Sequence, residues 1–314
     1  MPALLEAKNL VRKFGHITAV DDVSFDIQQG EIFSLLGPNG AGKTTTISML
    51  STLLEPSSGD ALIQGFSIKN DNMQVRELIG IVPQEIALYE DLSARENLFY
   101  WGRLYNLGGP ALENRVNEVL EQIGLSERAK DRVKTYSGGM KRRVNIAAGL
   151  LHKPKLLFMD EPTVGIDPQS RRMILDTIKE LNQEGMTILY TTHHMEEAQE
   201  LSDRVGIMDH GKLIAIGTQD ELTQETNETD LIQVQLDPSD DKPFIISQLE
   251  TMDEIQQVKI EENALSLFTK DAESSLAPII NRLSQLEAHI KAIEVVEPNL
   301  ETVFLQLTGR ALRD

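Results

Sequence analysis

A lysine and two threonines follow a glycine-rich segment near the start of the chain, and this combination of residue types can bind phosphate. The segment and its flank read Gly37, Pro38, Asn39, Gly40, Ala41, Gly42, Lys43, Thr44 and Thr45. Its glycines let successive backbone N–H groups turn inward around phosphate oxygens. Lys43 can reach the terminal phosphates of a nucleotide, and the Thr44 hydroxyl can ligate magnesium. The pattern predicts that these nine residues form a phosphate-binding loop for a nucleotide.

Two adjacent carboxylates end an apolar run later in the chain. Asp160 and Glu161 follow residues 156–159, whose continuous apolar pattern is typical of a fully buried strand. Ligands in open α/β sheets bind at the carboxyl ends of the strands, so these carboxylates are expected near the phosphate loop. Neighbouring side chains of a strand point to opposite faces, which favours two different roles. We therefore assign Asp160 to magnesium, through water, and Glu161 to polarising the water that attacks the terminal phosphate.

A third segment begins at Tyr136 and places a serine and two glycines before a helix-like stretch. Such groups at a helix N-terminus can form an anion-binding surface, although a plain helix cap would have the same composition. The segment resembles the signature motif of ATP-binding cassette (ABC) proteins, in which Ser137, Gly138 and Gly139 would bear the phosphate contacts. The commonest form of that motif has Leu and Gln at the positions of Tyr136 and Met140. Tyr and Met at these places resemble the branch that serves drug and antibiotic exporters.

Four single residues match further elements of the ABC family and stand in its order along the chain. Gln84 matches the glutamine that contacts magnesium and water and senses a transmembrane partner. Asp167 matches the residue that reaches across the dimer interface, and His193 matches the switch histidine that touches the terminal phosphate. Phe14 lies where an aromatic ring usually stacks on adenine. Each signal is weak by itself, and it is their common order that supports the resemblance.

Alternating strand-like and helix-like segments position these residues. Residues 32–36 are strand-like and residues 45–53 are helix-like, so the phosphate loop has the expected context. The alternation continues to residue 219 and predicts an α/β fold with a RecA-like parallel sheet. Residues 85–150 have mostly helical spacing and resemble the helical subdomain that ABC proteins insert into this core. The basic run 141–143 is expected to be a solvated helix face.

Residues 220–314 differ from the rest in charge and lack nucleotide motifs. They hold 20 Asp and Glu against 7 Lys and Arg, which is −13 of the chain's net charge of −19. We place the domain boundary at 219/220, with the polar stretch 218–230 as the linker. The following segments have the order β-α-β-β-α-β and predict a small α+β, ferredoxin-like accessory domain. These segments are 231–236, 244–252, 255–260, 264–268, 275–286 and 290–296.

The end of the chain carries a proline stop at Pro298 followed by a helix start. Together with residues 307–310, it resembles the ending of drug-exporter ABC subunits. We expect the C-terminal domain to pack against its own subunit or a dimer partner. Binding of a regulator is the alternative.

Composition excludes several classes of protein. No apolar run approaches the roughly 18–20 residues that cross a bilayer, and no secretory signal opens the chain, so we expect a soluble, intracellular protein. The absence of cysteine rules out disulfides. The strong acidity argues against nucleic acid as a partner, because such binding depends on neutralising phosphates with Lys and Arg.

The resemblance implies the ATPase subunit of an ABC exporter that uses ATP and Mg²⁺. Two copies would pair head to tail as a homodimer through two bridging ATP molecules. Separately encoded integral membrane permease subunits would move the substrate, which is expected to be an amphiphilic drug or antibiotic. The chain would then lie in the cytoplasm, peripheral on the inner face of the cell membrane. A soluble ABC-type regulatory or DNA-maintenance ATPase is the alternative, and a nucleotide switch without hydrolysis is a weaker one, since Glu161 argues against it.

Overall fold

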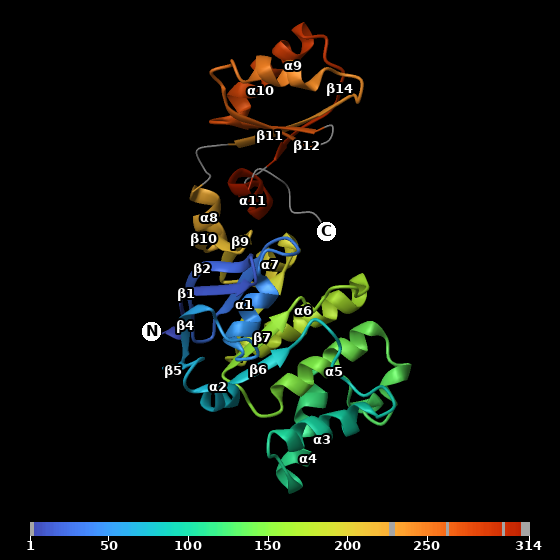
Figure 1. Cartoon of the computed structure of the whole chain (residues 1–314). Coiled ribbons are helices and arrows are strands. Elements are labelled where there is room, and N and C mark those ends of the chain that lie inside the picture. The colour runs from blue at the N-terminus through green and yellow to red at the C-terminus, as the bar shows by residue number, and fades with distance from the viewer. Residues whose placement is uncertain (1–2, 226–229, 262–263, 297–298, 309–314) are drawn as a thin grey trace. The chain divides into compact units, whose positions relative to one another are not determined.

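The chain forms two compact units, which are described separately (Figure 1). The computed structural model describes residues 3–225, 230–261, 264–296 and 299–308. Unit 1 extends to residue 216, and unit 2 spans residues 217–313. The centre of the predicted linker, residues 226–229, lies outside the described residues, as do Pro298 and residues 309–310 of the tail.

A six-stranded sheet forms the centre of unit 1, with the strand order β10-β9-β3-β8-β7-β6. Strand β3 pairs in parallel with β8 and β9, and β7 pairs in parallel with β8 and β6. The strands are β3 (Ile32–Leu36), β6 (Ile79–Val82), β7 (Leu156–Asp160), β8 (Thr187–Thr192), β9 (Arg204–Asp209) and β10 (Lys212–Gly217). The predicted α/β fold with a parallel sheet is therefore confirmed.

Both faces of this sheet are covered, since β3, β7 and β8 are buried at every position. In β7, Leu156 and Phe158 belong to one buried cluster, whereas Leu157 and Met159 belong to another on the opposite face. The first cluster also contains side chains of a four-stranded antiparallel sheet, which the sequence patterns did not distinguish. Its strands are β1 (Ala3–Phe14), β2 (Ile17–Gln28), β4 (Ser58–Ile63) and β5 (Phe66–Ser67).

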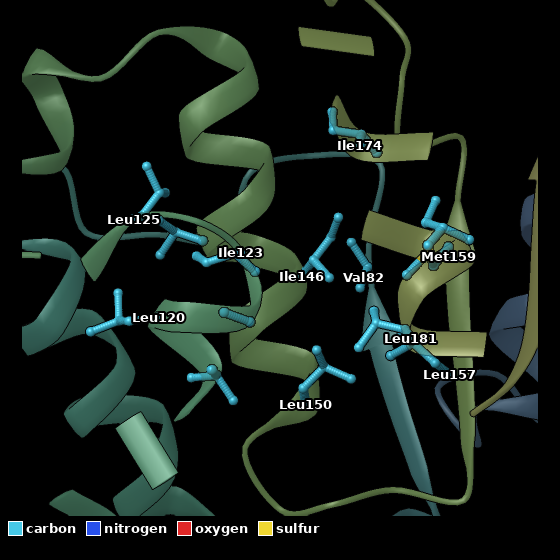
Figure 2. Packing of buried hydrophobic residues seen from close by; sticks show 14 of the residues in the cluster. Val82, Leu120, Ile123, Leu125, Ile146, Leu150, Leu157, Met159, Ile174 and Leu181 are labelled. Carbon is cyan, nitrogen blue, oxygen red and sulfur yellow. The ribbon is translucent and has the colours of Figure 1, made fainter. Parts of the chain in front are cut away.

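Helices account for most of the segment between β6 and β7. They are α3 (Ala94–Leu104), α4 (Gly109–Gln122) and α5 (Gly138–Leu150), with short 3₁₀ turns at Ser126–Arg128 and Val133–Thr135. Figure 2 shows Ile146 and Leu150 of α5 between two groups of buried side chains. On one side lie Leu120, Ile123 and Leu125, and on the other lie Val82, Leu157 and Met159. Helix α5 thus connects the helical segment to the sheet.

The remaining helices of unit 1 follow strands of the central sheet or cover its edge. They are α1 (Lys43–Leu50), α2 (Asn72–Leu78), α6 (Pro168–Gln183) and α7 (Met195–Leu201). Helix α1 begins at Lys43, so it includes the last three residues of the predicted phosphate loop, and α6 and α7 follow β7 and β8. Because the strands are parallel, the loops that precede α1, α6 and α7 all leave the same edge of the sheet.

Unit 2 has the element order predicted from its sequence pattern, which is that of a ferredoxin-like sandwich. Its antiparallel sheet has the order β12-β13-β11-β14. The elements are α8 (Gln219–Glu225), β11 (Asp230–Leu236), α9 (Lys242–Leu249), β12 (Ile255–Glu261), β13 (Ala264–Thr269), α10 (Ala272–Gln285), β14 (Ile290–Val296) and α11 (Leu300–Thr308). Side chains of α9 and α10 pack on one face of the sheet, and Leu305 of α11 packs with Leu231 and Phe268.

Part of the predicted linker is helical, which corrects the assignment of residues 218–230. The Thr218 hydroxyl accepts a hydrogen bond from the Glu221 backbone N–H at 3.1 Å, and the Glu221 carboxylate accepts one from the Thr218 N–H at 2.8 Å. This reciprocal pair is a capping box, and it starts α8. Leu222 is buried and anchors the helix. The Thr-x-x-Glu spacing of this capping box lies within a stretch whose polar composition otherwise favours a linker.

Candidate active site

The phosphate loop lines a cavity of about 350 Å³ at the carboxyl edge of the central sheet. Its lining consists of Ala19, Asn39, Gly40, Ala41, Gly42, Lys43, Thr44, Thr45, Gln84 and Glu161. Gly42 precedes α1 with φ of 103°, and a side chain there would come within 2.6 Å of the Ala19 carbonyl oxygen. Only glycine fits this position. The N-terminus of α1 therefore opens at the cavity with its N–H groups free to bind an anion.

Lys43 is buried beside the loop, and its ammonium group is fully engaged. Its Nζ donates to the carbonyl oxygens of Gly37 and Pro38, at 2.6 and 3.1 Å. The same nitrogen lies 3.0 Å from Oε1 of Glu161. The cation thus holds the loop closed and lies where phosphate oxygens would enter the cavity.

Asp160 ends strand β7 and is held by two hydroxyl groups. Thr191 donates to its Oδ1 at 2.6 Å, and Thr44 donates to the same oxygen at 3.2 Å. Burial raises the pKa of the Asp160 carboxyl group, and the hydrogen bonds from Thr191 and Thr44 oppose this shift. A hydroxyl and a carboxylate this close together are hard oxygen ligands, and they fit a magnesium ion whose remaining ligands are water and phosphate.

Glu161 follows Asp160 with φ of 43°, so the strand geometry ends between the two carboxylates. The different surroundings of the two groups therefore come from a turn, and not from strand alternation as the sequence suggested. The backbone N–H of Glu161 donates to the Thr191 hydroxyl at 3.0 Å. Its Oε2 lies 3.1 Å from Nδ1 of His193. Glu161 thus meets Lys43 through one carboxylate oxygen and His193 through the other.

Gln84 lies at the cavity, and its backbone is held from α5. Arg142 donates to the carbonyl oxygens of Pro83, at 2.6 Å, and of Gln84. Asn145, one turn later on the same helix, accepts from the Ala87 N–H at 3.2 Å. Arg142 is only 3% exposed, so the expectation of a solvated basic face at residues 141–143 was wrong at this position. A basic run has no local signal that distinguishes a buried arginine from an exposed one.

The predicted signature residues begin helix α5 and do not line the cavity. The Ser137 hydroxyl accepts from the Met140 N–H at 3.3 Å and serves as the N-cap. Gly138 is exposed, whereas Gly139 is buried against Ser170 of α6. A side chain at Gly139 would come within 2.3 Å of the Ser170 Cβ. The structure therefore adds a packing reason for this glycine.

We expect Gly139→Ala to lower the free energy of unfolding by about 1–3 kcal/mol, because it overpacks the contact with Ser170. The double variant Gly139→Ala/Ser170→Gly should recover most of this loss. Gly138→Ala is the matched control, since its Cβ would meet only the Ile166 Cδ1, at 3.4 Å. Denaturant unfolding of the four proteins checks this, and equal stability of Gly138→Ala and Gly139→Ala would contradict the packing argument.

Asp167 and Phe14 also lie outside the cavity lining. Asp167 is exposed and caps helix α6, accepting from the Ser170 N–H at 3.0 Å, and this hydrogen bond lowers the pKa of its carboxyl group. Phe14 is 47% exposed near the end of β1, with the Arg12 guanidinium 4.6 Å from its ring centre. Ala19 lines the cavity, although the sequence patterns did not single it out.

Comparison with known proteins identifies the family. The family described as ABC transporter matches residues 20–164. A linearmycin resistance ATP-binding protein from Bacillus subtilis (strain 168) is 46% identical over 99% of this chain and 100% of its own length. The chain belongs to the ABC transporter family. A doxorubicin resistance ATP-binding protein from Mycobacterium tuberculosis (strain CDC 1551 / Oshkosh) is 38% identical over 94% of this chain and 89% of its own.

Solved structures of ABC proteins share the fold of the nucleotide-binding part. The ATP-binding subunit of an ABC transporter is 32% identical, with a TM-score of 0.64 over 71% of this chain and 92% of its own. A dimeric ATP-binding cassette in a post-hydrolysis state with ADP and phosphate is 28% identical to this chain. Its TM-score is 0.61, and the match covers 68% of this chain and 98% of that one. The RecA-like core and the ATPase activity expected from the sequence are thereby confirmed. Among the described helices, none is both long and apolar enough to cross a membrane.

Proposed function

We propose that this chain is the ATPase subunit of an exporter for an amphiphilic drug or antibiotic. The observation that carries the proposal is the cavity itself, where the phosphate loop, Gln84 and Glu161 meet, with Asp160 hydrogen-bonded to Thr44 of that loop. The similarity to a linearmycin resistance protein over its full length, and to a doxorubicin resistance protein over 89% of its length, supports the export of such a substrate.

In this proposal Lys43 and the loop amides bind the nucleotide phosphates, and Thr44, Asp160 and Gln84 hold Mg²⁺. Magnesium, when bound, offsets negative charge on the phosphates. Glu161 orients and polarises the attacking water. His193, in contact with Glu161, lies beside the terminal phosphate. Catalysis is then positioning and electrostatic stabilisation, as is general for phosphoryl transfer.

The site is completed by a second copy of the chain. Ser137, Gly138, Gly139 and Asp167 lie at the starts of α5 and α6 and do not line the cavity, which leaves them available to a nucleotide bound by a second copy. We propose a head-to-tail homodimer in which each of two ATP molecules lies between the phosphate loop of one subunit and the signature residues of the other, with Phe14 against adenine. Removal of the bridging γ-phosphate by hydrolysis then lets the subunits separate.

A separately encoded integral membrane permease couples this cycle to transport, with the chain peripheral on the cytoplasmic face of the membrane. Helix α3 carries the surface that fits this role. An apolar groove of about 550 Å³ there is lined by Leu92, Glu96, Phe99, Tyr100, Arg103 and Leu104. It lies in the helical segment that Arg142 ties to Gln84, so a partner on this groove has a physical route to the cavity.

The first experiment is purification from membranes in mild detergent with Mg²⁺ and ATP, followed by mass spectrometry. We expect a stoichiometric partner with several apolar spans of about 20 residues each. Leu104→Glu, at a side chain that is 58% exposed, should abolish co-purification while ATP hydrolysis by the purified subunit is unchanged. A soluble partner, with Leu104→Glu without effect, would instead support the regulatory or DNA-maintenance ATPase.

A further inference from the structure

A buried carboxylate that the site described above does not use lies directly behind it. Glu197, on helix α7, is only 2% exposed and does not line the cavity. Three hydroxyl groups donate to it: Thr163 to Oε1 at 2.7 Å, and Tyr190 and Thr192 to Oε2 at 2.7 and 2.8 Å. Nε of Arg171 lies 3.7 Å from Oε1. No sequence motif pointed to this residue.

The carboxylate sets the direction of every hydrogen bond in this network, because it can only accept. Burial and the nearby Glu197 charge raise the pKa of the Tyr190 phenol, which therefore keeps its proton and donates it. The Thr192 hydroxyl also donates to Glu197, so its lone pairs remain available. They accept the backbone N–H of His194 at 2.9 Å. The arrangement is a chain from Glu197 through Thr192 to the residue after His193.

Glu197 thereby holds both loops that bear the reacting groups. Thr192 and His194 flank His193, and the Thr192 carbonyl oxygen accepts from the Gly37 N–H of the phosphate loop at 3.3 Å. Thr163, on the other side of the network, lies two residues after Glu161. The loop of His193 and the loop of Glu161 are joined through one side chain, behind the 3.1 Å contact between Glu161 and His193.

We propose that Glu197 is a positioning residue for ATP hydrolysis, which fixes the contact between Glu161 and His193 by holding both of their loops. The inference rests on the proposed roles of these two residues. Glu197 itself touches neither nucleotide nor water, and it acts through the geometry of its neighbours. Because nucleotide binding depends on the phosphate loop, loss of Glu197 should affect turnover far more than affinity.

The central test compares kcat and KM for ATP in Glu197→Leu and Glu197→Gln. The leucine has no acceptor for the three hydroxyls, so the loops shift, and we expect kcat to fall by about 10- to 100-fold with KM changed by less than about threefold. Glutamine keeps one acceptor oxygen for Thr192 and should retain most of kcat. If Glu197→Leu fails to fold, Thr192→Val is the deciding variant. It removes the hydroxyl that joins Glu197 to the His194 N–H, leaves the Tyr190 and Thr163 hydrogen bonds in place, and should lower kcat in the same way.

Glu31 supplies the matched control for the removal of a buried carboxylate. It is 6% exposed, accepts a hydrogen bond from the Gln28 N–H and lies 3.3 Å from Arg204, just before β3 and thus at the opposite end of the sheet. Glu31→Leu should lower the unfolding temperature as Glu197→Leu does, with kcat unchanged. Equal kcat losses in the two variants would overturn the proposal, because the effect would then be general destabilisation.

A double-mutant cycle tests whether Glu197 acts by positioning His193 or independently of it. Glu197→Leu should lower the rate of single-turnover hydrolysis by a much smaller factor in a His193→Ala background than in the wild type. The side chain that Glu197 positions is already absent in that background. Additive losses would contradict the proposal. If His193→Ala and Glu161→Gln hydrolyse ATP at the wild-type rate, the proposed site roles fail. If those variants are impaired but Glu197→Leu is not, only this inference fails.

Discussion

Glu161→Gln is expected to lower ATP hydrolysis by about 10²- to 10⁴-fold, because the variant loses the carboxylate that polarises the attacking water. The glutamine has nearly the same shape, so the fold should be retained. With Mg²⁺ and ATP the variant should accumulate as a dimer, since the bridging phosphate is no longer removed. Phosphate release measures the first effect, and size-exclusion chromatography with ATP measures the second.

The ion pair between Lys43 and Glu161 adds a second consequence for the same variant. The carboxylate lies 3.0 Å from the ammonium group that the phosphates need, so Glu161 and the nucleotide compete for this cation. Glu161→Gln should therefore bind ADP more tightly than the wild type, a readout that requires neither hydrolysis nor ATP-bridged dimers. Glu180→Gln, at an exposed position of α6, is the control and should match the wild type in all three measurements. Wild-type hydrolysis by Glu161→Gln would refute the assigned role.

Lys43→Ala is expected to weaken ATP binding by at least about tenfold, since hydrogen bonds to a charged group contribute about 1.5–3 kcal/mol. Two losses combine in this variant. The phosphates lose a cation, and the carbonyl oxygens of Gly37 and Pro38 lose the donor that closes the loop. Titration calorimetry with ATP measures the change.

The Glu161 carboxylate that remains in Lys43→Ala also affects ATP binding. Without Lys43, the buried Glu161 carboxylate loses its ion pair with that lysine and repels phosphate, so Lys43→Ala/Glu161→Gln should bind ATP more tightly than Lys43→Ala alone. Lys153→Ala removes an exposed lysine, 3.7 Å from Glu118, and should leave affinity unchanged. Unchanged affinity in Lys43→Ala would show that the loop amides alone bind the phosphates.

Local sequence patterns were sufficient to predict a site when its residues are neighbours along the chain. The strand β3, the phosphate loop and the helix α1 follow one another without a break, so their spacing alone predicted the anion site at the start of α1. The order of elements in unit 2 was equally readable, because its strand-like segments and its segments of helical spacing can be told apart along the chain. Helix α8 was missed although its capping box is local.

The sequence by itself determined which residues could do chemistry, namely Lys43, Asp160, Glu161 and the residues that match further motifs of the ABC family. Only the tertiary structure decided how they are held. Thr191 lies 31 residues from Asp160 and orients it, and Glu197 lies 34 residues from Thr163. Such partners are brought together by the pairing of parallel strands and by the packing of helices on the sheet. A hydroxyl or a buried carboxylate has no sequence signature of its own, so its role follows from its neighbours in space and not along the chain.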